Sequence, residues 1–262
     1  MSEAPMGRFV WYDLMTTDPA AAAEFYTTVA GWGTDTWDGP VEGMPPYKLF
    51  TANGNSFGGL MELSAAAREA GAPPHWLAYI AVSDVDATVE RATELGGALL
   101  MGPQDIPTVG RFAVLADPAG AVFAAFTPEN DAPGHDGPAN LGEISWHELM
   151  TGNCDEAFEF YAALFGWDKG EAVDMGEAGI YQMFDRGGRP LGGIMNKPPE
   201  MPAGAWNYYV RIDDLDAAVG RVSGNGGTVM HGPMEVPGGD RVAVCQDPQG
   251  AVFALHYVSA DA

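Results

Sequence analysis

The chain has 262 residues, of which 47% are hydrophobic and 18% are charged. Twelve Lys and Arg face 36 Asp and Glu, so the net charge is -24 at pH 7. Such an acidic chain is repelled by nucleic-acid phosphates and by anionic membrane surfaces, so we expect neither as a partner. No apolar run is long enough to span a bilayer, and the N-terminus lacks a signal-peptide pattern. We expect a cytoplasmic protein of one large or two ordinary domains.

Hydrophobic periodicity predicts a regular order of elements along the first half of the chain. Alternating apolar residues indicate strands, and Asp18-Pro19 and Asp84 are typical helix starts. Gly31 and Gly96-Gly97 are typical helix ends. The expected elements form the order strand, helix, further strands, twice over, at residues 8–15, 20–29, 47–51, 57–63, 76–82, 84–95, 98–101, 111–115 and 122–126.

The second half repeats the first. Residues 76–126 align without a gap onto 206–256 with 22 of 51 identical, and residues 11–32 match 146–167 at 10 of 22 positions. The segment 127–142 is rich in Pro, Gly, Asp and Asn and has no apolar period, which is typical of a linker. We therefore predict two homologous domains, at 1–126 and 143–262, joined by a linker at 127–142.

The repeated unit also predicts the fold class. Each strand–helix–three-strand unit occurs twice per domain, and helices are too few to cover both faces of a parallel sheet. We expect an α+β fold in which helices cover one face of an open antiparallel sheet. The other face of a curved sheet is concave and is a natural place for a ligand.

Two sets of motifs carry a family resemblance. One is Asp18 followed by Glu24-Phe25-Tyr26 and Gly31-Trp32, with a copy at 159–167; the other is the Asp-Pro-x-Gly turn at 117–120 and 247–250. This pattern resembles the vicinal oxygen chelate superfamily, which includes glyoxalase I, bleomycin-resistance proteins and extradiol dioxygenases. The resemblance implies tandem glyoxalase-like domains, each with two βαβββ units that form a cupped mixed sheet. We call the hollow of such a sheet the cup.

The resemblance also implies where a divalent metal would be held. Metal-dependent members take His, Glu or Gln from the first and last strands of each unit. The matching positions here are Trp11, Glu62, Leu77 and Ala124 in the first domain, and Trp146, Asn196, Asn207 and Ala254 in the second. Indole and alkyl groups do not ligate metals, and one carboxylate or amide does not make a site. We therefore predict a protein without a metal or other cofactor.

The expected cup linings are aromatic, with a few polar groups. We expect Trp11, Tyr79 and Phe126 in the first domain, with Asp13 and Glu62 as polar groups. In the second domain we expect Trp146, Tyr209, Asn196, Asn207, Glu148 and His256. Aromatic walls with a few convergent polar groups suit a flat organic ligand, although the same residues could simply fill the cup.

Two histidines lie on or beside the expected cup strands. His256 shares a strand face with Ala254, so we expect it to face the cup rather than to stand in water at a strand end. His147 falls on the other face of its strand from Trp146, where a packed and hydrogen-bonded histidine is expected. A histidine and a carboxylate can exchange protons with a substrate without a metal, which makes His256 and Glu148 the candidate catalytic pair.

Three functions follow from these residues. The first is a monomeric or homodimeric protein that binds a small aromatic or quinone-like metabolite without a metal. The alternative is a glyoxalase-like lyase or oxygenase that acts through His256 and Glu148. The third is a scaffold whose cups are filled. Between the halves, Leu77 becomes Asn207 and Phe126 becomes His256, so the second domain is expected to be the more polar site.

Overall fold

The computed structural model describes residues 5–39, 47–69 and 71–259. The first half of the chain contains β1 (Phe9–Thr16), α1 (Pro19–Ala30), β2 (Gly33–Trp37), β3 (Tyr47–Ala52), β4 (Asn55–Glu62), α2 (Ala65–Glu69), β5 (His75–Ala81), α3 (Val85–Glu94), β6 (Ala98–Ile106), β7 (Gly110–Ala116) and β8 (Val122–Pro128). The second half contains β9 (Ile144–Thr151), α4 (Cys154–Phe165), β10 (Asp168–Asp174), the 3-10 helix η1 (Gly176–Ala178), β11 (Ile180–Arg186), β12 (Arg189–Asn196), β13 (Ala205–Arg211), α5 (Leu215–Gly224), β14 (Thr228–Glu235), β15 (Arg241–Gln246) and β16 (Val252–Tyr257).

The four long helices begin where capping residues were predicted or at their equivalents. The Asp18 carboxylate accepts a hydrogen bond from the Ala21 amide at 3.0 Å, and Asp84 accepts one from Ala87 at 3.0 Å. Asn153 and Asp214 cap α4 and α5 in the same way. Each cap satisfies a backbone N–H that has no partner within the helix, so these side chains fix the first turn.

Two eight-stranded sheets form, one from each half of the chain. Their strand orders are β2-β3-β4-β1-β5-β8-β7-β6 and β10-β11-β12-β9-β13-β16-β15-β14. The pairs β1–β4 and β5–β8 are parallel, as are β9–β12 and β13–β16, whereas the hairpin-connected strands run antiparallel. The α+β class and the mixed sheets implied by the family resemblance are confirmed, and the purely antiparallel sheet expected from helix count alone is wrong.

The prediction of the elements missed two short segments. Strand β2 has the sequence GTDTW and is almost fully exposed, so it shows no alternation of buried and exposed residues. Helix α2 has only five residues. Both are too short or too polar to produce a periodic apolar signal.

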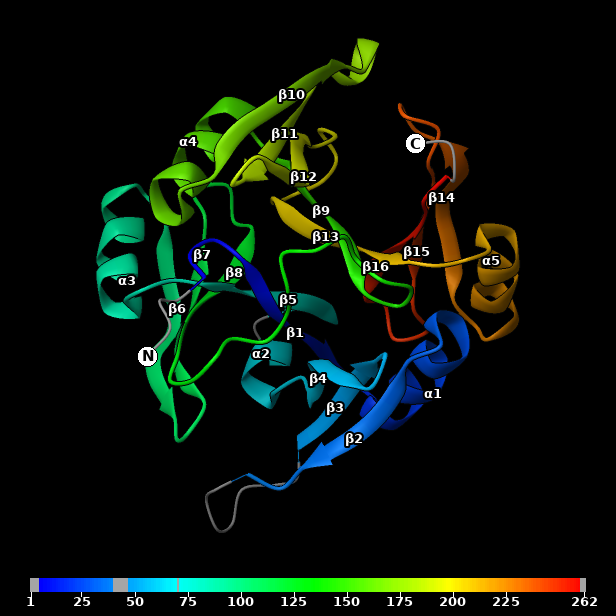
Figure 1. Ribbon diagram of the computed structural model, residues 1–262, viewed down its shortest axis with the longest axis horizontal. Coiled ribbons are helices and arrows are strands. Elements are labelled where there is room, and N and C mark those ends of the chain that lie inside the picture. The colour runs from blue at the N-terminus through cyan, green and yellow to red at the C-terminus, as the bar shows by residue number, and fades with distance from the viewer. Residues whose placement is uncertain (1–4, 40–46, 70, 260–262) are drawn as a thin grey trace. The chain divides into compact units, whose positions relative to one another are not determined.

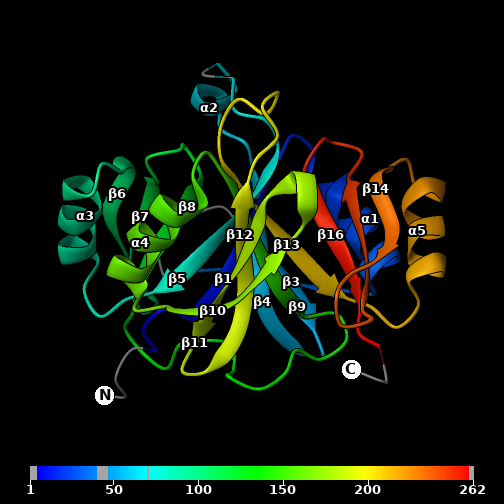
Figure 2. The ribbon, with the colours of Figure 1, turned by 90° about the horizontal axis from the view of Figure 1, so that it is seen from above.

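The chain packs as two compact units that do not follow the sequence halves. Among the described residues, unit 1 contains 5–11, 77–136 and 146–206. Unit 2 contains 12–39, 47–69, 71–76, 137–145 and 207–259. In unit 1, α3 lies beside α4, and in unit 2, α1 lies beside α5 (Figures 1 and 2). Each unit therefore combines one strand–helix module from each half of the sequence.

A buried hydrogen-bond relay holds unit 2 together across the two halves of the sequence. The Trp76 indole N–H donates to the Tyr26 hydroxyl at 3.0 Å, and this hydroxyl donates to Asp247 Oδ2 at 3.1 Å. The other oxygen of Asp247 accepts the backbone N–H groups of its own Asp-Pro-x-Gly turn. Burial raises the pKa of Asp247, although these hydrogen bonds act against the rise.

Unit 1 contains the same relay built from the equivalent residues. The Trp206 indole donates to the Tyr161 hydroxyl at 3.0 Å, and Tyr161 donates to Asp117 Oδ2 at 3.1 Å. The tryptophans of the Gly-Trp motifs are also pinned, since Trp32 donates to the carbonyl of Gly142 and Trp167 donates to that of Gly7. The motifs that carried the family resemblance are therefore core residues of the fold.

In the parts of the chain that the structure describes, no helix combines the length and the apolar composition needed to cross a bilayer.

Candidate functional site

In unit 1, an indole, a phenol and a carboxylate form a chain of hydrogen bonds on the sheet. The Trp146 indole N–H on β9 donates to the Tyr181 hydroxyl on β11 at 2.7 Å, and Tyr181 in turn donates to Glu148. All three side chains are partly exposed. This arrangement confirms that Trp146 and Glu148 share a strand face, as alternation predicted.

Glycine creates the space for this chain of hydrogen bonds. Gly193 on β12 lies opposite Glu148 on β9, and a Cβ at this position would overlap the ring of Tyr181. The Tyr181 ring therefore occupies the space beside Gly193, and its hydroxyl reaches the carboxylate. Any larger residue at Gly193 would push the ring away and open the chain of hydrogen bonds.

The electrostatics fix the direction of each hydrogen bond. Burial and then the nearby negative charge of Glu148 raise the pKa of Tyr181 far above its ordinary value of 10.0. The phenol is therefore protonated at all physiological pH values and donates to the carboxylate. Glu148 is left as a hydrogen-bond acceptor beside an aromatic surface.

Unit 2 contains the equivalent pair from the first half. The Tyr47 hydroxyl on β3 donates to the Asp13 carboxylate on β1, and a Cβ at Gly59 would overlap the Tyr47 ring. Asp13 is 3% exposed. On the opposite face of β3, Phe50 packs against Tyr26 of α1, so Tyr47 lies on the face away from that helix. A tyrosine that packs over a glycine and donates to a carboxylate thus occurs in each unit.

The other aromatic residues predicted for the first domain lie in unit 1. Tyr79 on β5 and Phe126 on β8 are both buried, and their ring centroids are 6.4 Å apart. Phe112 on β7 packs against Tyr79 at 5.9 Å. Trp11 on β1 is partly exposed. Tyr79, Phe112 and Phe126 thus form a cluster of packed aromatic rings.

Asn207 and Tyr209 lie on β13 in unit 2 and are 2% and 5% exposed. Their neighbour Tyr208 points to the other face, where its ring meets that of Tyr12 at 5.6 Å. The side-chain oxygen of Asn207, Oδ1, accepts a hydrogen bond from the backbone N–H of Tyr208 at 3.1 Å. The side-chain nitrogen of Asn207, Nδ2, is buried and has no hydrogen-bond partner.

His256 on β16 lies between two polar side chains of unit 2. Its Nε2 lies 2.9 Å from Asp240 Oδ2, and its Nδ1 lies 2.8 Å from Ser145 Oγ. Asp240 also accepts from the Ser259 amide, and Ser145 donates to the Tyr209 carbonyl. The carboxylate that the structure places beside His256 is thus Asp240, whereas Glu148, the predicted partner, belongs to unit 1 and bonds Tyr181.

His147 is a structural histidine, as predicted. It is 5% exposed, its Nδ1 lies 2.8 Å from the Leu191 carbonyl oxygen, and its ring stacks on Phe9 with centroids 3.6 Å apart. Burial lowers its pKa from 6.5 to about 4. The imidazole is therefore neutral at physiological pH.

The family's metal positions do not fit a divalent ion. Glu62 is exposed at the end of β4 and pairs with Arg68 at 3.5 Å, while Asn196 at the end of β12 accepts from the Cys154 amide at 2.9 Å. The other positions hold an indole, an alkyl group or a lone amide, in Trp11, Trp146, Leu77, Ala124, Ala254 and Asn207. Within 5–39, 47–69 and 71–259, no three His, Cys, Asp or Glu side chains lie close enough to hold a metal. A catalytic metal needs about three protein ligands.

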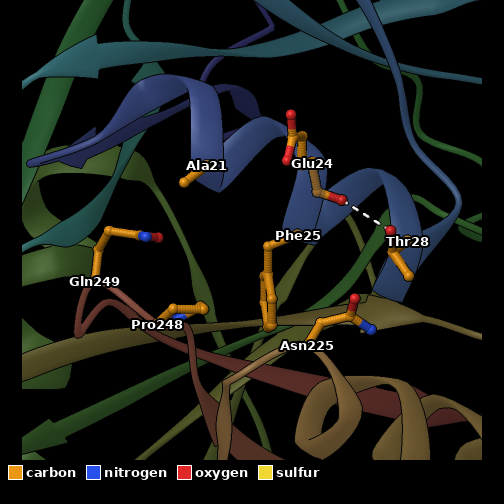
Figure 3. Close-up of a pocket in the computed structure, with 7 residues that line it drawn as sticks. All are labelled: Ala21, Glu24, Phe25, Thr28, Asn225, Pro248 and Gln249. Atoms are coloured by element: carbon orange, nitrogen blue, oxygen red, sulfur yellow. Dashed lines mark hydrogen bonds between the residues drawn. The ribbon is translucent and has the colours of Figure 1, made fainter.

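A surface pocket of 320 Å³ lies elsewhere in unit 2 (Figure 3). It is bounded by α1, by the end of α5 and by the turn before β16, and contains none of the predicted site residues. Its lining consists of Ala21, Glu24, Phe25, Thr28, Asn225, Pro248 and Gln249. The Thr28 hydroxyl donates to the Glu24 carbonyl at 2.9 Å, so part of its polar lining is already paired.

Sequence reasoning missed four residues of these polar clusters, namely Tyr47, Tyr181, Asp240 and Ser145. The two tyrosines carried a usable signal, because YKLF at 47–50 and YQMF at 181–184 recur at the same offset of 134 as the paired glycines. Asp240 and Ser145 have no such signal, since Asp240 lies in a loop 16 residues before His256 and Ser145 lies 111 residues before it.

The comparisons with known proteins agree with this architecture. The model of the glyoxalase/bleomycin resistance protein/dioxygenase superfamily matches residues 8–124 and 143–255. The chain belongs to this superfamily, and the family resemblance seen in the sequence is confirmed.

Similar proteins span nearly the whole chain. CFP32 of Mycobacterium tuberculosis, provisionally named a glyoxylase, is 36% identical over 258 residues, covering 97% of this chain and 96% of that protein. DnrV of Streptomyces peucetius, named an anthracycline biosynthesis protein, is 31% identical over 276 residues, covering 97% and 94%. The crystal structure of 2,2',3-trihydroxybiphenyl 1,2-dioxygenase from Sphingomonas wittichii strain RW1 superposes with a TM-score of 0.68 at 12% identity, covering 97% and 91%, which shows a shared fold.

Proposed function

We propose that the protein binds a small, flat aromatic or quinone-like metabolite without a divalent metal, and that the surface around Trp146 takes part in binding. The observation that carries this proposal is the hydrogen-bonded set of Trp146, Tyr181 and Glu148 in unit 1. Aromatic faces stack on flat ligands, and an adjacent acceptor orients a ligand hydroxyl. Most residues at the family's metal positions have no group that can ligate a metal, which supports binding without one.

One relative adds support for the ligand class. DnrV is named for anthracycline biosynthesis, and anthracyclines are fused-ring aromatic compounds that contain a quinone. The match covers 97% of this chain, so it includes both halves that supply the aromatic clusters. The proposal transfers only the chemical class of the ligand, and not its identity.

The test is binding of 1,2-dihydroxyanthraquinone, measured by isothermal titration calorimetry on protein dialysed against EDTA. Trp146→Ala removes the aromatic surface, and Tyr181→Phe removes the hydroxyl that holds Glu148 in place. We expect each change to weaken binding by about tenfold or more, equivalent to about 1.4 kcal/mol. Met230→Ala, at an exposed residue on β14, is the matched control and is expected to change nothing.

Two results would contradict the proposal. One is that the dialysed wild-type protein fails to bind the probe and regains binding when zinc or manganese is added. The other is that Trp146→Ala and Tyr181→Phe both bind like the wild-type protein.

A second candidate is metal-free acid–base catalysis, the alternative expected from the sequence. The observation in its favour is the pairing of His256 with Asp240, since a carboxylate orients an imidazole for proton transfer. His256→Phe places the first-half residue at this position and removes the titrating group. If the protein converts the probe, mass spectrometry will show product with the wild-type protein and not with this variant, while binding persists.

A further inference from the structure

The side-chain amide of Asn207 has a buried donor that the protein leaves unused. The residue is 2% exposed, and Nδ2 makes no hydrogen bond. Its Oδ1 accepts from the Tyr208 amide at 3.1 Å, which sets the orientation of the amide group and leaves the N–H₂ side without a partner. A buried donor without an acceptor is unfavourable, so native proteins rarely keep one without a reason.

The fold itself does not require a polar residue at this position. Leu77 occupies the equivalent place on β5 in the first half and is 3% exposed. The surrounding strands share the same register, because Tyr79 lies opposite Ala124 and Tyr209 lies opposite Ala254. One copy of the repeat thus accepts a well-buried leucine where the other keeps a costly amide. The amide therefore points to a role outside the packing of the sheet.

Alternation along β13 places Asn207 on the opposite face from Tyr208. Tyr208 and Phe253 occupy the opposite face, where they pack on Tyr12 and on Phe25 of α1. Asn207 and Tyr209 alternate with Tyr208 along β13, so they share the other face. This face also carries His256, which follows Ala254 by two residues on the neighbouring strand.

We propose that the Asn207 Nδ2 group donates a hydrogen bond to a carbonyl oxygen of the bound ligand, and so selects a quinone or ketone over a plain hydrocarbon. This inference rests on the proposed function for the class of ligand, and it concerns a contact within unit 2 rather than the Trp146 surface of unit 1. An N–H donor needs an acceptor, and a carbonyl oxygen is the acceptor that a quinone supplies.

The test uses 1,4-naphthoquinone labelled with ¹³C at both carbonyls, and naphthalene as the matched ligand without a carbonyl. Infrared spectroscopy measures the carbonyl stretch of the bound quinone, which moves to lower frequency when the oxygen accepts a hydrogen bond. Asn207→Leu installs the residue of the first half, and Asn207→Asp keeps the shape but replaces the N–H₂ donor with an acceptor. Met230→Ala, at an exposed residue on β14, is the control variant.

We expect the wild-type protein and the control to lower the carbonyl frequency, and both Asn207 variants to lose this change. Affinity for naphthoquinone falls about tenfold in the variants, as for the loss of one buried hydrogen bond. Affinity for naphthalene stays the same or rises in Asn207→Leu. A purely structural amide would not alter the carbonyl frequency of a bound ligand.

The outcomes separate the two claims. If naphthoquinone binds Asn207→Leu with the wild-type affinity and carbonyl frequency, this inference is wrong and the proposed function stands. If the wild-type protein binds neither naphthoquinone nor naphthalene, the proposed function is wrong and the inference falls with it. A circular dichroism spectrum of each variant verifies that it is folded. If Asn207→Leu does not fold, the affinity and carbonyl frequency measured with Asn207→Asp decide whether the inference holds.

Discussion

The buried relays and the polar positions on the opposite face differ in how much they have changed between the two halves of the chain. On the helix-packed face, the relay Trp76–Tyr26–Asp247 of unit 2 and the relay Trp206–Tyr161–Asp117 of unit 1 have the same residues and nearly the same distances. On the other face, Leu77 corresponds to Asn207, Phe126 to His256 and Asp13 to Glu148. The relay positions are thus the same in both halves, whereas the polar positions of the other face differ, although that face keeps its aromatic pairs Trp11 with Trp146 and Tyr79 with Tyr209. The fold accounts for the relays, and the changed positions are where the two halves can differ in what they bind.

The largest expected effect comes from breaking the repeated relay. Tyr26→Phe leaves the Trp76 indole and one oxygen of Asp247 buried without partners, and each lost partner costs about 2 kcal/mol. We expect a loss of about 4 kcal/mol in the free energy of unfolding, and a similar loss for Tyr161→Phe. Urea denaturation followed by circular dichroism measures both. A loss in only one of the two variants would show that the relays are not equivalent.

The next effect is a dependence of stability on pH that only one copy can show. His147 corresponds to Tyr12 in the first half, so only the second half has a buried imidazole here. Its pKa is lowered to about 4, so the unfolded chain takes up a proton below pH 6.5 that the folded chain refuses. Stability is therefore fully present above pH 6.5 and falls as the pH drops towards 4, by about 3 kcal/mol at about 1.4 kcal/mol for each pKa unit.

The matched variant for this prediction is His147→Phe, which keeps a ring against Phe9 and removes the titration. The free energy of unfolding of the wild-type protein, minus that of the variant, is expected to fall steadily as the pH drops from 6.5 to 4. Using this difference cancels the buried aspartates Asp117 and Asp247, whose raised pKa values act in the opposite direction. A constant difference over that range would refute the assignment of a neutral, buried His147.

Much of the fold could be predicted because the repeat and the caps are local signals. Asp18, Asp84 and their equivalents mark helix starts, and the ungapped match of 76–126 to 206–256 fixes the copies. The sequence could not predict that each unit combines a strand–helix module from the first half with one from the second half. This combination depends on contacts such as Tyr26 with Asp247, which are 221 residues apart and leave no periodic trace in one sequence.

The candidate site was predictable only in part for the same reason. Alternation along one strand places Glu148 on the face of Trp146, and this holds in the structure. The partner of each polar group comes from another strand or loop, as Tyr181 does for Glu148 and Asp240 does for His256. Which strands become neighbours, and in which register, is decided by tertiary packing rather than by the local pattern.

Native mass spectrometry of the protein, taken directly from cells into a volatile buffer, tests the central claim most directly. The account predicts the chain mass together with an adduct of an aromatic organic molecule, with no transition metal retained after dialysis. The adduct is expected to be lost from Trp146→Ala protein prepared in the same way. About one zinc, iron, nickel or manganese ion per chain that survives dialysis would contradict the account, since the donor set lacks the roughly three ligands such an ion requires.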